Sequence, residues 1–327
     1  YFRMKREAVV GIDIGGTFTK FGIVDKEGNC YFEGSVPTQS DENESVEAYV
    51  ANLSTKIKSV IGNFPDLEIR GLGIGVPNGN YYRGTIEHAA NLKWKGIVPL
   101  ADLFRQYFTV PVVLTNDANA AAIGEMVYGG AKNMRDFIVI TLGTGLGSGI
   151  VANGHLLYGH DGFAGELGHV TVYPEGRVCG CGRRGCLETY VSATGIKRTV
   201  FELLAQSMVD SPLRNIPYQE LTAENIAKYA QLGDRIALEA FDFTAKILGQ
   251  KLADAVAFTS PEAIFIFGGL AKAGDLLLAP TRKYFEESLL PVYRNKIKIL
   301  LSEMTEVNAA VLGAGALAWS EIQTKNS

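Results

Sequence analysis

One pattern of residues occurs twice in this chain, and it constrains the fold more than any other feature. Residues 9–14 form a short apolar run that ends at Gly15 and Gly16, and residues 17–24 continue with side chains that favour strands. Residues 137–142 and 148–151 repeat this arrangement around a second glycine-rich turn. Each segment has the pattern of a β-hairpin. Two similar openings predict two similar domains, and 327 residues with 47% hydrophobic content can bury both cores.

The rest of the chain alternates between strand and helix patterns. Strands are expected at 69–76, 112–115 and 263–267, and helices at 45–61, 118–128, 198–208, 223–231, 235–259 and 308–320. Strands with helices between them predict an α/β fold. We expect an N-terminal α/β domain at 1–118, completed by a C-terminal helix at 308–327, and a larger C-terminal domain at 119–307.

A cluster of metal ligands lies in the expected larger domain. His169, Cys179, Cys181 and Cys186 fall in one short segment, and Cys30 is the only other cysteine. One imidazole and three thiolates are the ligand set of a tetrahedral structural Zn²⁺ site, which leaves no position open for water. Three free thiols in a glycine-rich loop are the alternative, and the scarcity of cysteine elsewhere argues against it.

Three glycine clusters follow predicted strands. Glycine is used where the chain bends tightly or lets a ligand approach. The first cluster can direct backbone N–H groups, hydroxyls and a cation toward one small anion, and it comprises Gly15, Gly16, Thr17, Thr19 and Lys20. The others comprise Gly143, Thr144 and Gly145, and Gly268 and Gly269. Any one cluster alone is better explained as a tight turn, whereas three together are harder to explain only as turns. None has the spacing of a Walker A loop or of a dinucleotide-binding loop, so NAD is not expected.

Charge and hydropathy argue against two classes of partner. The chain has 35 acidic and 31 basic residues, a net charge of −4, and no long basic block, so we expect no nucleic-acid partner. No run of about 18 apolar residues lacks charge, and the N-terminus has no signal-peptide pattern. We therefore expect a cytoplasmic protein with no membrane partner.

Several motifs resemble those of the ROK group (repressors, open reading frames and kinases), within the superfamily of sugar kinases, heat-shock protein 70 and actin. DIGGTFTK at 13–20 resembles the group's first phosphate loop, LGTGLGSG at 142–149 its second, and FGGL at 267–270 its adenosine motif. GELGH at 165–169 and CGCGRRGC at 179–186 resemble its more specific ExGH and zinc signatures. NLKW at 91–94 and LETYVSATG at 187–195 are most similar to the bacterial zinc-containing glucokinases of the group.

This resemblance implies an actin-like (ribonuclease H-like) fold, whose two domains close over a cleft on ATP, Mg²⁺ and a hexose. Asp117 matches the family's catalytic base, a carboxylate that accepts the proton of the attacking sugar hydroxyl. Asp13 is expected to hold Mg²⁺, and the glycine clusters to place N–H groups around the phosphates. Asp117 also has a simpler explanation, because an aspartate between a strand and a helix serves as a helix N-cap.

The family's sugar contacts correspond to six residues of this chain: Asn91, Asn116, Asp117, Glu166, His169 and Glu188. His169 can ligate zinc through one ring nitrogen and offer the other to a sugar hydroxyl. For Glu166 and Glu188, a solvated loop carboxylate is the competing explanation. Gly75 is expected to add a backbone contact from the first domain.

The resemblance implies an ATP-dependent hexose kinase with a structural Zn²⁺, closest to enzymes that convert glucose to glucose 6-phosphate, and a homodimer. Kinases of N-acetylmannosamine, N-acetylglucosamine, fructose or allose share the same motifs, so the sugar stays open. Repressors of the group are non-catalytic sugar sensors with an added N-terminal helix-turn-helix domain, for which we expect no room before residue 11. A zinc-ribbon interaction module is disfavoured, because the cysteines occupy a small part of the chain.

Overall fold

Two five-stranded sheets with the same strand order form the centres of two structural units. The computed structural model describes residues 5–38, 43–304 and 306–325. Unit 1 comprises Tyr1–Met134, Leu156–Gly165 and Glu303–Ser327, and unit 2 comprises Arg135–His155 and Glu166–Ser302. The sheet orders are β3-β2-β1-β4-β8 and β11-β10-β9-β12-β13. The repeated pattern in the sequence thus corresponds to a repeated topology.

The sheet of unit 1 combines a hairpin with two parallel strands. Its strands are β3 (Cys30–Pro37), β2 (Phe18–Val24), β1 (Arg6–Ile14), β4 (Leu67–Gly75) and β8 (Val112–Thr115). β1 pairs antiparallel with β2 and parallel with β4, which pairs parallel with β8. A smaller sheet contains β5 (Gly79–Asn80), β6 (Thr85–Glu87) and β7 (Ile97–Val98).

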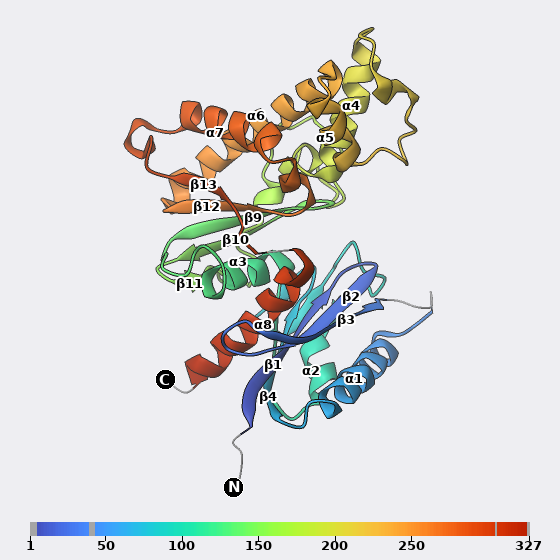
Figure 1. Cartoon of the computed structure of the whole chain (residues 1–327), viewed down its shortest axis with the longest axis vertical. Helices are drawn as coiled ribbons and strands as arrows, with labels where there is room; N and C mark the ends of the chain where they lie inside the picture. Colours follow the sequence, from blue (N-terminus) through green and yellow to red (C-terminus); the bar gives the residue numbers. More distant parts are fainter. Residues whose placement is uncertain (1–4, 39–42, 305, 326–327) are drawn as a thin grey trace. The chain divides into compact units, whose positions relative to one another are not determined.

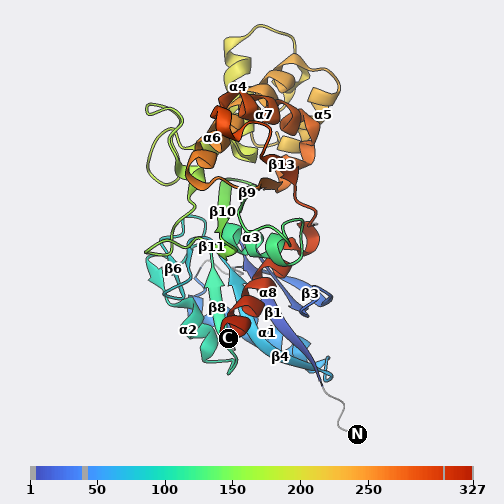
Figure 2. The same ribbon diagram turned by 90° about the vertical axis from the view of Figure 1, so that its left-hand side faces the viewer.

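Glycines on β1 and β4 allow a helix to lie directly against one face of this sheet. α8 (Glu306–Lys325) crosses that face with α3 (Asp117–Val127) beside it (Figure 1, Figure 2). A Cβ atom on Gly11 or Gly73 would collide with the backbone of α8. α1 (Val46–Gly62) and α2 (Leu100–Arg105) cover the other face, where Leu53 and Phe104 join a core with Ile12 and other strand residues.

Unit 2 has the same kind of sheet under a larger helical layer (Figure 1). Its strands are β9 (Phe137–Leu142), β10 (Leu146–Ala152), β11 (His155–Leu156), β12 (Ala263–Phe267) and β13 (Lys298–Leu301). Its α-helices are α4 (Ala193–Gln206), α5 (Ala223–Gln231), α6 (Arg235–Thr259) and α7 (Asp275–Ser288). The 3-10 helices are η1 (Leu167–His169), η2 (Leu187–Thr189), η3 (Pro212–Asn215), η4 (Gly269–Ala273) and η5 (Pro291–Tyr293). α6 and α7 pack on each other and on the sheet through Leu248, Leu252 and Phe285.

The expected boundary at residue 118 differs from the division that the structure shows. α3 follows that boundary but belongs to unit 1, because it packs along α8 with the backbone of Gly124 close to Gly313. Residues 156–165 also return to unit 1, where Tyr158 stacks on Tyr81 at a ring-centroid distance of 4.2 Å. Within the described residues, no helix combines the length and the apolar character needed to cross a bilayer.

Candidate active site and metal centre

Three parallel strands of unit 1 end side by side and bring two carboxylates together. Asp13 near the end of β1 lies opposite Gly75, the last residue of β4, and Gly75 lies opposite Thr115, the last residue of β8. A Cβ atom on Gly75 would lie 3.7 Å from Asp13 Oδ1 and 3.7 Å from the Cα of Asp117. Gly75 therefore occupies the narrow space between the two aspartates, a role that its expected backbone contact with substrate did not include.

Asp117 begins α3 but is not its N-cap. That position belongs to Asn116, whose side-chain oxygen accepts a hydrogen bond of 2.8 Å from the N–H of Ala118. Oδ1 of Asp117 accepts from the same N–H group at 2.8 Å, which leaves Oδ2 for other partners. Asp117 retains exposed surface, yet the protein atoms around its carboxyl group displace water and raise its pKa, partly opposed by the backbone N–H donors. Because Asn116 caps α3, Asp117 is better suited to accept a proton than to serve as the helix N-cap.

The carboxyl group of Asp13 titrates close to neutral pH. Its pKa is raised to about 7, mainly by desolvation and also by the nearby charge of Asp117, while Lys20 on the paired strand opposes the shift. Like charges near one another disfavour double ionisation, whereas a bound cation would favour it. The two aspartates thus form a site whose electrostatics favour a divalent cation such as Mg²⁺.

The first glycine cluster forms a closed turn between β1 and β2. The N–H of Gly15 donates to Phe18 O at 3.0 Å, so this donor is used within the turn and does not face a phosphate as expected. A Cβ atom on Gly16 would lie 2.7 Å from Asn91 O, which brings the segment with the expected sugar contact against the turn. Thr17 is exposed at this turn.

The hydroxyl of Thr19 points into the core, which corrects the expectation that it faces an anion. Thr19 is fully buried because strand alternation directs it inward, while Phe18 beside it is 56% exposed. Its Oγ1 lies 3.0 Å from Thr38 Oγ1 and 2.6 Å from the hydroxyl of Tyr49. Thr38 Oγ1 in turn donates to Gly15 O at 2.6 Å. A chain of buried hydroxyls therefore holds the turn from inside.

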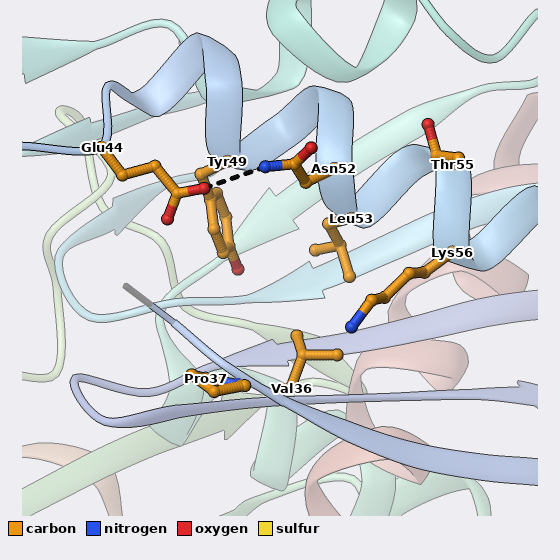
Figure 3. Close-up of a pocket in the computed structure, with 8 residues that line it drawn as sticks. All are labelled: Val36, Pro37, Glu44, Tyr49, Asn52, Leu53, Thr55 and Lys56. Atoms are coloured by element: carbon orange, nitrogen blue, oxygen red, sulfur yellow. Dashed lines mark hydrogen bonds between the residues drawn. The ribbon is translucent and has the colours of Figure 1, made fainter. Parts of the chain in front are cut away.

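Tyr49 also borders a surface groove of about 360 Å³ between α1 and β3 (Figure 3). Val36 and Leu53 form part of its apolar lining, and Asn52 Nδ2 donates to Glu44 Oε1 at 3.1 Å on its rim. Among the described residues, the groove is lined by none of the predicted site residues. It is separate from the candidate active site.

The four predicted zinc ligands come together in unit 2. The ligand atoms of His169, Cys179, Cys181 and Cys186 all lie within 4.8 Å of one another. Cys181 Sγ lies 3.7 Å from Cys186 Sγ, and Cys179 Sγ lies 3.7 Å from His169 Nδ1. A tetrahedral Zn²⁺ with Zn–S bonds of about 2.3 Å separates its sulfur ligands by about 3.8 Å. Both the spacing and the donor types fit a closed structural zinc site.

A tight turn presents the first two cysteines. Gly182 N–H donates to Cys179 O at 3.1 Å, and Cys179 N–H donates to Arg183 O at 2.9 Å. Gly182 adopts a φ of 87°, a conformation that side-chain-bearing residues rarely accept. Glycine at position 182 is therefore required by the geometry of the ligand turn.

The two ring nitrogens of His169 face different neighbours. Nδ1 faces the cysteines, whereas Nε2 lies 3.9 Å from Glu166 Oε2. Glu188 Oε1 lies 3.9 Å from Nδ1 and accepts a hydrogen bond of 3.1 Å from Cys179 Sγ. The side chain of Glu188 is 23% exposed, which argues against the solvated-carboxylate explanation for this residue. Glu166 at 47% exposed remains accessible to a ligand.

Glu188 also contacts the second glycine cluster. Its Oε2 accepts from Leu146 N–H at 3.4 Å, and a Cβ atom on Gly145 would lie 2.5 Å from that oxygen. The turn itself closes through Gly143 N–H, which donates to Gly145 O at 3.1 Å, while Thr144 at its tip is exposed. The segment that carries the zinc ligands and the second glycine cluster are thus adjacent in unit 2.

The third glycine cluster packs against the end of β9. Gly268 has a φ of 106°, and a Cβ atom there would lie 2.5 Å from Leu142 O. Gly269 follows at the start of η4 and is exposed. Unit 2 therefore brings the second and third glycine clusters together at the carboxyl ends of β9 and β12.

Sequence reasoning missed two groups of residues that hold these segments. Thr38 and Tyr49 lie far from the first turn in sequence, and only their buried contact with Thr19 reveals the hydroxyl chain. Arg177 precedes the cysteines in a glycine-rich loop, where an arginine is expected to be solvated, yet it is buried. In neither case does residue type or spacing in the sequence indicate that these residues hold the site segments.

Comparison with known proteins identifies the family. A family model described as ROK family matches residues 9–321, and the chain belongs to this family. The glucokinase of Halalkalibacterium halodurans is 37% identical over 325 residues, covering 97% of this chain and 96% of that protein. The xylose repressor of Caldicellulosiruptor bescii is 31% identical over 318 residues, covering 96% of this chain and 79% of the repressor.

A solved relative agrees in fold. One solved relative is a ROK family glucokinase from Streptomyces griseus in complex with glucose and AMPPNP. Its crystal structure matches this chain with a TM-score of 0.78 and 31% sequence identity, covering 96% of this chain and 99% of the glucokinase chain. Together with the duplicated sheets, this likeness confirms the two-domain actin-like sugar kinase fold.

Proposed function

We propose that this chain is an ATP-dependent hexose kinase that converts D-glucose to glucose 6-phosphate. The observation that carries the proposal is the pair Asp13 and Asp117 on either side of Gly75, at the carboxyl ends of parallel strands. Near full-length similarity to a glucokinase, at 37% identity, supports glucose as the substrate. A zinc-fitting cluster beside Glu166 and Glu188 supports a polar sugar site.

Asp117 is the catalytic base in this proposal. It orients the attacking hydroxyl and accepts its proton, the hydroxyl oxygen bonds to the γ-phosphorus of ATP, and ADP leaves as the bond to the bridging oxygen breaks. Because the transition state of phosphoryl transfer is loose, the carboxylate acts mainly by holding the hydroxyl in place. A pKa raised by desolvation improves its ability to accept the proton.

The other predicted site residues are assigned to contact either the nucleotide or the sugar. Asp13 would hold Mg²⁺, which when bound neutralises charge on the transferred phosphoryl group. Nucleotide contacts are assigned to Gly16 and Thr17 with Lys20, to Gly143, Thr144 and Gly145, and to Gly268 and Gly269. The sugar hydroxyls are assigned to Asn91, Asn116, Glu166, His169 and Glu188, because a buried hydroxyl needs a hydrogen-bond partner. Zn²⁺, when bound, would fix the ring of His169 so that Nε2 faces the sugar.

A coupled assay of ADP release with ATP and Mg²⁺ tests the proposal. Glucose would be compared with mannose, fructose, allose, N-acetylglucosamine and N-acetylmannosamine, for the wild type and for Asp117→Ala. Highest turnover on glucose, lost in the variant, is the expected result. A peak on another sugar would retain the mechanism and change the substrate.

A non-catalytic sugar sensor is the second candidate, because the similarity to a xylose repressor covers 96% of this chain. Sugar binding without turnover on any hexose, in folded zinc-loaded protein, would favour it.

We also propose a cytoplasmic homodimer without nucleic-acid or membrane partners. The net charge of −4 supports the lack of nucleic acid. Light scattering of the purified protein would measure the oligomeric state, and a gel shift with duplex DNA would test the lack of nucleic-acid binding.

A further inference from the structure

Arg177 is a buried charge at the start of the zinc loop, which we define as residues 177–186. Its side chain is 5% exposed, although most residues of the loop are exposed, and it lies two residues before Cys179. A charged group is rarely buried unless its hydrogen-bonding capacity is fully used, because desolvation costs several kcal/mol. The surroundings of Arg177 meet that condition.

Every N–H group of the guanidinium has an acceptor. Nε donates to Glu202 Oε1 at 2.9 Å, and Nη2 donates to Glu202 Oε2 at 2.6 Å and to Thr199 Oγ1 at 2.9 Å. Nη1 donates to Thr189 O at 2.7 Å and to Gly195 O at 3.1 Å. Only arginine presents five donors in one plane, so a lysine cannot reproduce this set.

The backbone of Arg177 is held as well. Its N–H donates to the hydroxyl of Tyr190 at 3.0 Å, and the guanidinium lies 4.5 Å from the centre of the Tyr190 ring. Its carbonyl accepts from Gly185 N–H at 2.8 Å, next to Cys186. Arg177 therefore connects the segment that leads to Cys179 with the segment that carries Cys186.

These contacts fix the two buried zinc ligands relative to each other. Cys179 and Cys186 are 3% and 0% exposed, whereas Cys181 is exposed. Cys186 is the N-cap residue of η2, and Thr189 at the end of η2 is bound directly by Arg177. Bonds to Gly195, Thr199 and Glu202 anchor the whole arrangement on α4.

We propose that Arg177 is a positioning residue that pre-organises the zinc site by holding Cys179 and Cys186 in place before the metal binds. A flexible loop would lose conformational freedom when it closes around the ion, and that loss lowers metal affinity. Anchoring the loop on α4 removes most of this cost. The same anchor holds η2, which carries Glu188, so the position of this carboxylate also depends on Arg177.

The affinity for zinc tests this role without reference to kinase activity. The dissociation constant of Zn²⁺ would be measured by competition with a chromophoric chelator for the wild type, Arg177→Met and Arg177→Lys. We expect both variants to bind zinc about 10- to 100-fold more weakly, the range found when outer partners of metal ligands are removed. Arg177→Lys keeps the charge, so weak binding by this variant would assign the effect to geometry.

Arg184→Met is the matched control, because it removes a positive charge from the same loop at an exposed site with a single 3.3 Å bond to Gly176 O. Its zinc affinity should stay close to that of the wild type. Glu202→Gln provides a second, milder disruption of the anchor if Arg177→Met does not fold. Thermal unfolding of the zinc-free proteins separates this role from simple support of α4. Wild-type zinc affinity in folded Arg177→Lys and Glu202→Gln would overturn the proposal.

Discussion

The Oδ1 atom of Asp13 lies 3.7 Å from the position that a Cβ atom on Gly75 would occupy. The same Cβ position is 3.3 Å from the Cβ of Ala120, so a methyl group would press on α3 just after Asp117. We expect Gly75→Ala to lower kcat by about 10- to 100-fold, because small displacements of catalytic groups have effects of this size. Steady-state kinetics with the best sugar would measure it.

Gly71→Ala on the same strand is the control for this variant. A Cβ atom there would meet Ile322 Cδ1 and Pro111 O at 3.4 Å, a similarly tight fit that does not involve the aspartates. The two variants should lose comparable stability, whereas only Gly75→Ala should lose turnover. Equal kcat in both variants would show that Gly75 has no role in separating Asp13 from Asp117.

Asp117→Asn should lower kcat by about 10²- to 10⁴-fold, the usual contribution of a general base. The amide oxygen can still accept from Ala118 N–H, so the start of α3 should remain intact and KM for the sugar should change little. Asp102→Asn, which replaces an exposed aspartate in the first turn of α2, is the control. A large rise in KM at unchanged kcat would contradict the assignment of Asp117 as the base.

The pKa of Asp13, about 7 in the folded protein against an ordinary 3.8, predicts a pH dependence of stability. Between these values the folded protein retains a proton that the unfolded chain has released. The free energy of unfolding therefore falls as pH rises through this window. Urea denaturation in magnesium-free buffer at pH 5 and pH 8 should show a smaller fall for Asp13→Asn than for the wild type. Parallel pH profiles would mean that Asp13 does not titrate there.

Removal of zinc should abolish sugar binding while much of the fold survives. Bound Zn²⁺ would fix the ring of His169, whereas the sheets and helices of unit 2 have their own apolar core. Isothermal titration with sugar, on protein shown by metal analysis to be zinc-free, would measure the loss, and circular dichroism would follow the fold. Restored binding after zinc is added back is the control. Undiminished sugar affinity in the zinc-free protein would exclude this role of His169.

Two neighbouring threonines should respond differently to the same change. Thr19→Val leaves the buried hydroxyl of Tyr49 without its partner, so we expect the free energy of unfolding to fall by about 1–3 kcal/mol. Thr17→Val changes an exposed residue of the turn and should raise KM for ATP at nearly unchanged stability. Urea unfolding and ATP kinetics on both variants distinguish the roles. A Thr19→Val variant as stable as the wild type would contradict the hydroxyl chain.

The elements with strong periodicity were the ones that the sequence could predict. Helices at 223–231 and 235–259 and strands at 112–115 and 263–267 are found at those bounds, because apolar spacing and flanking turn residues agree there. The zinc ligands were identified because cysteine is scarce and its chemistry is specific. α2 and α7 were not predicted, since the short α2 and the proline inside α7 weaken their patterns.

The orientation of side chains at the turns was the part that the sequence could not supply. Thr17 and Thr19 have the same chemistry and lie two positions apart, yet one is exposed and the other is bonded within the core. Whether an N–H group such as that of Gly15 is free depends on the closure of the turn, which residue identity does not determine. The partners that decide both cases come from segments distant in the chain.

The contact between α8 and the strands β1 and β4 also determines the order in which the protein can mature during synthesis. Gly11 and Gly73 are synthesised before unit 2, whereas the helix that covers them is synthesised after it. Most of unit 2 is continuous between residues 166 and 302, so it can fold before unit 1 is closed. The unit that carries both aspartates is thus begun before unit 2 and completed after it, which delays activity until α8 has docked.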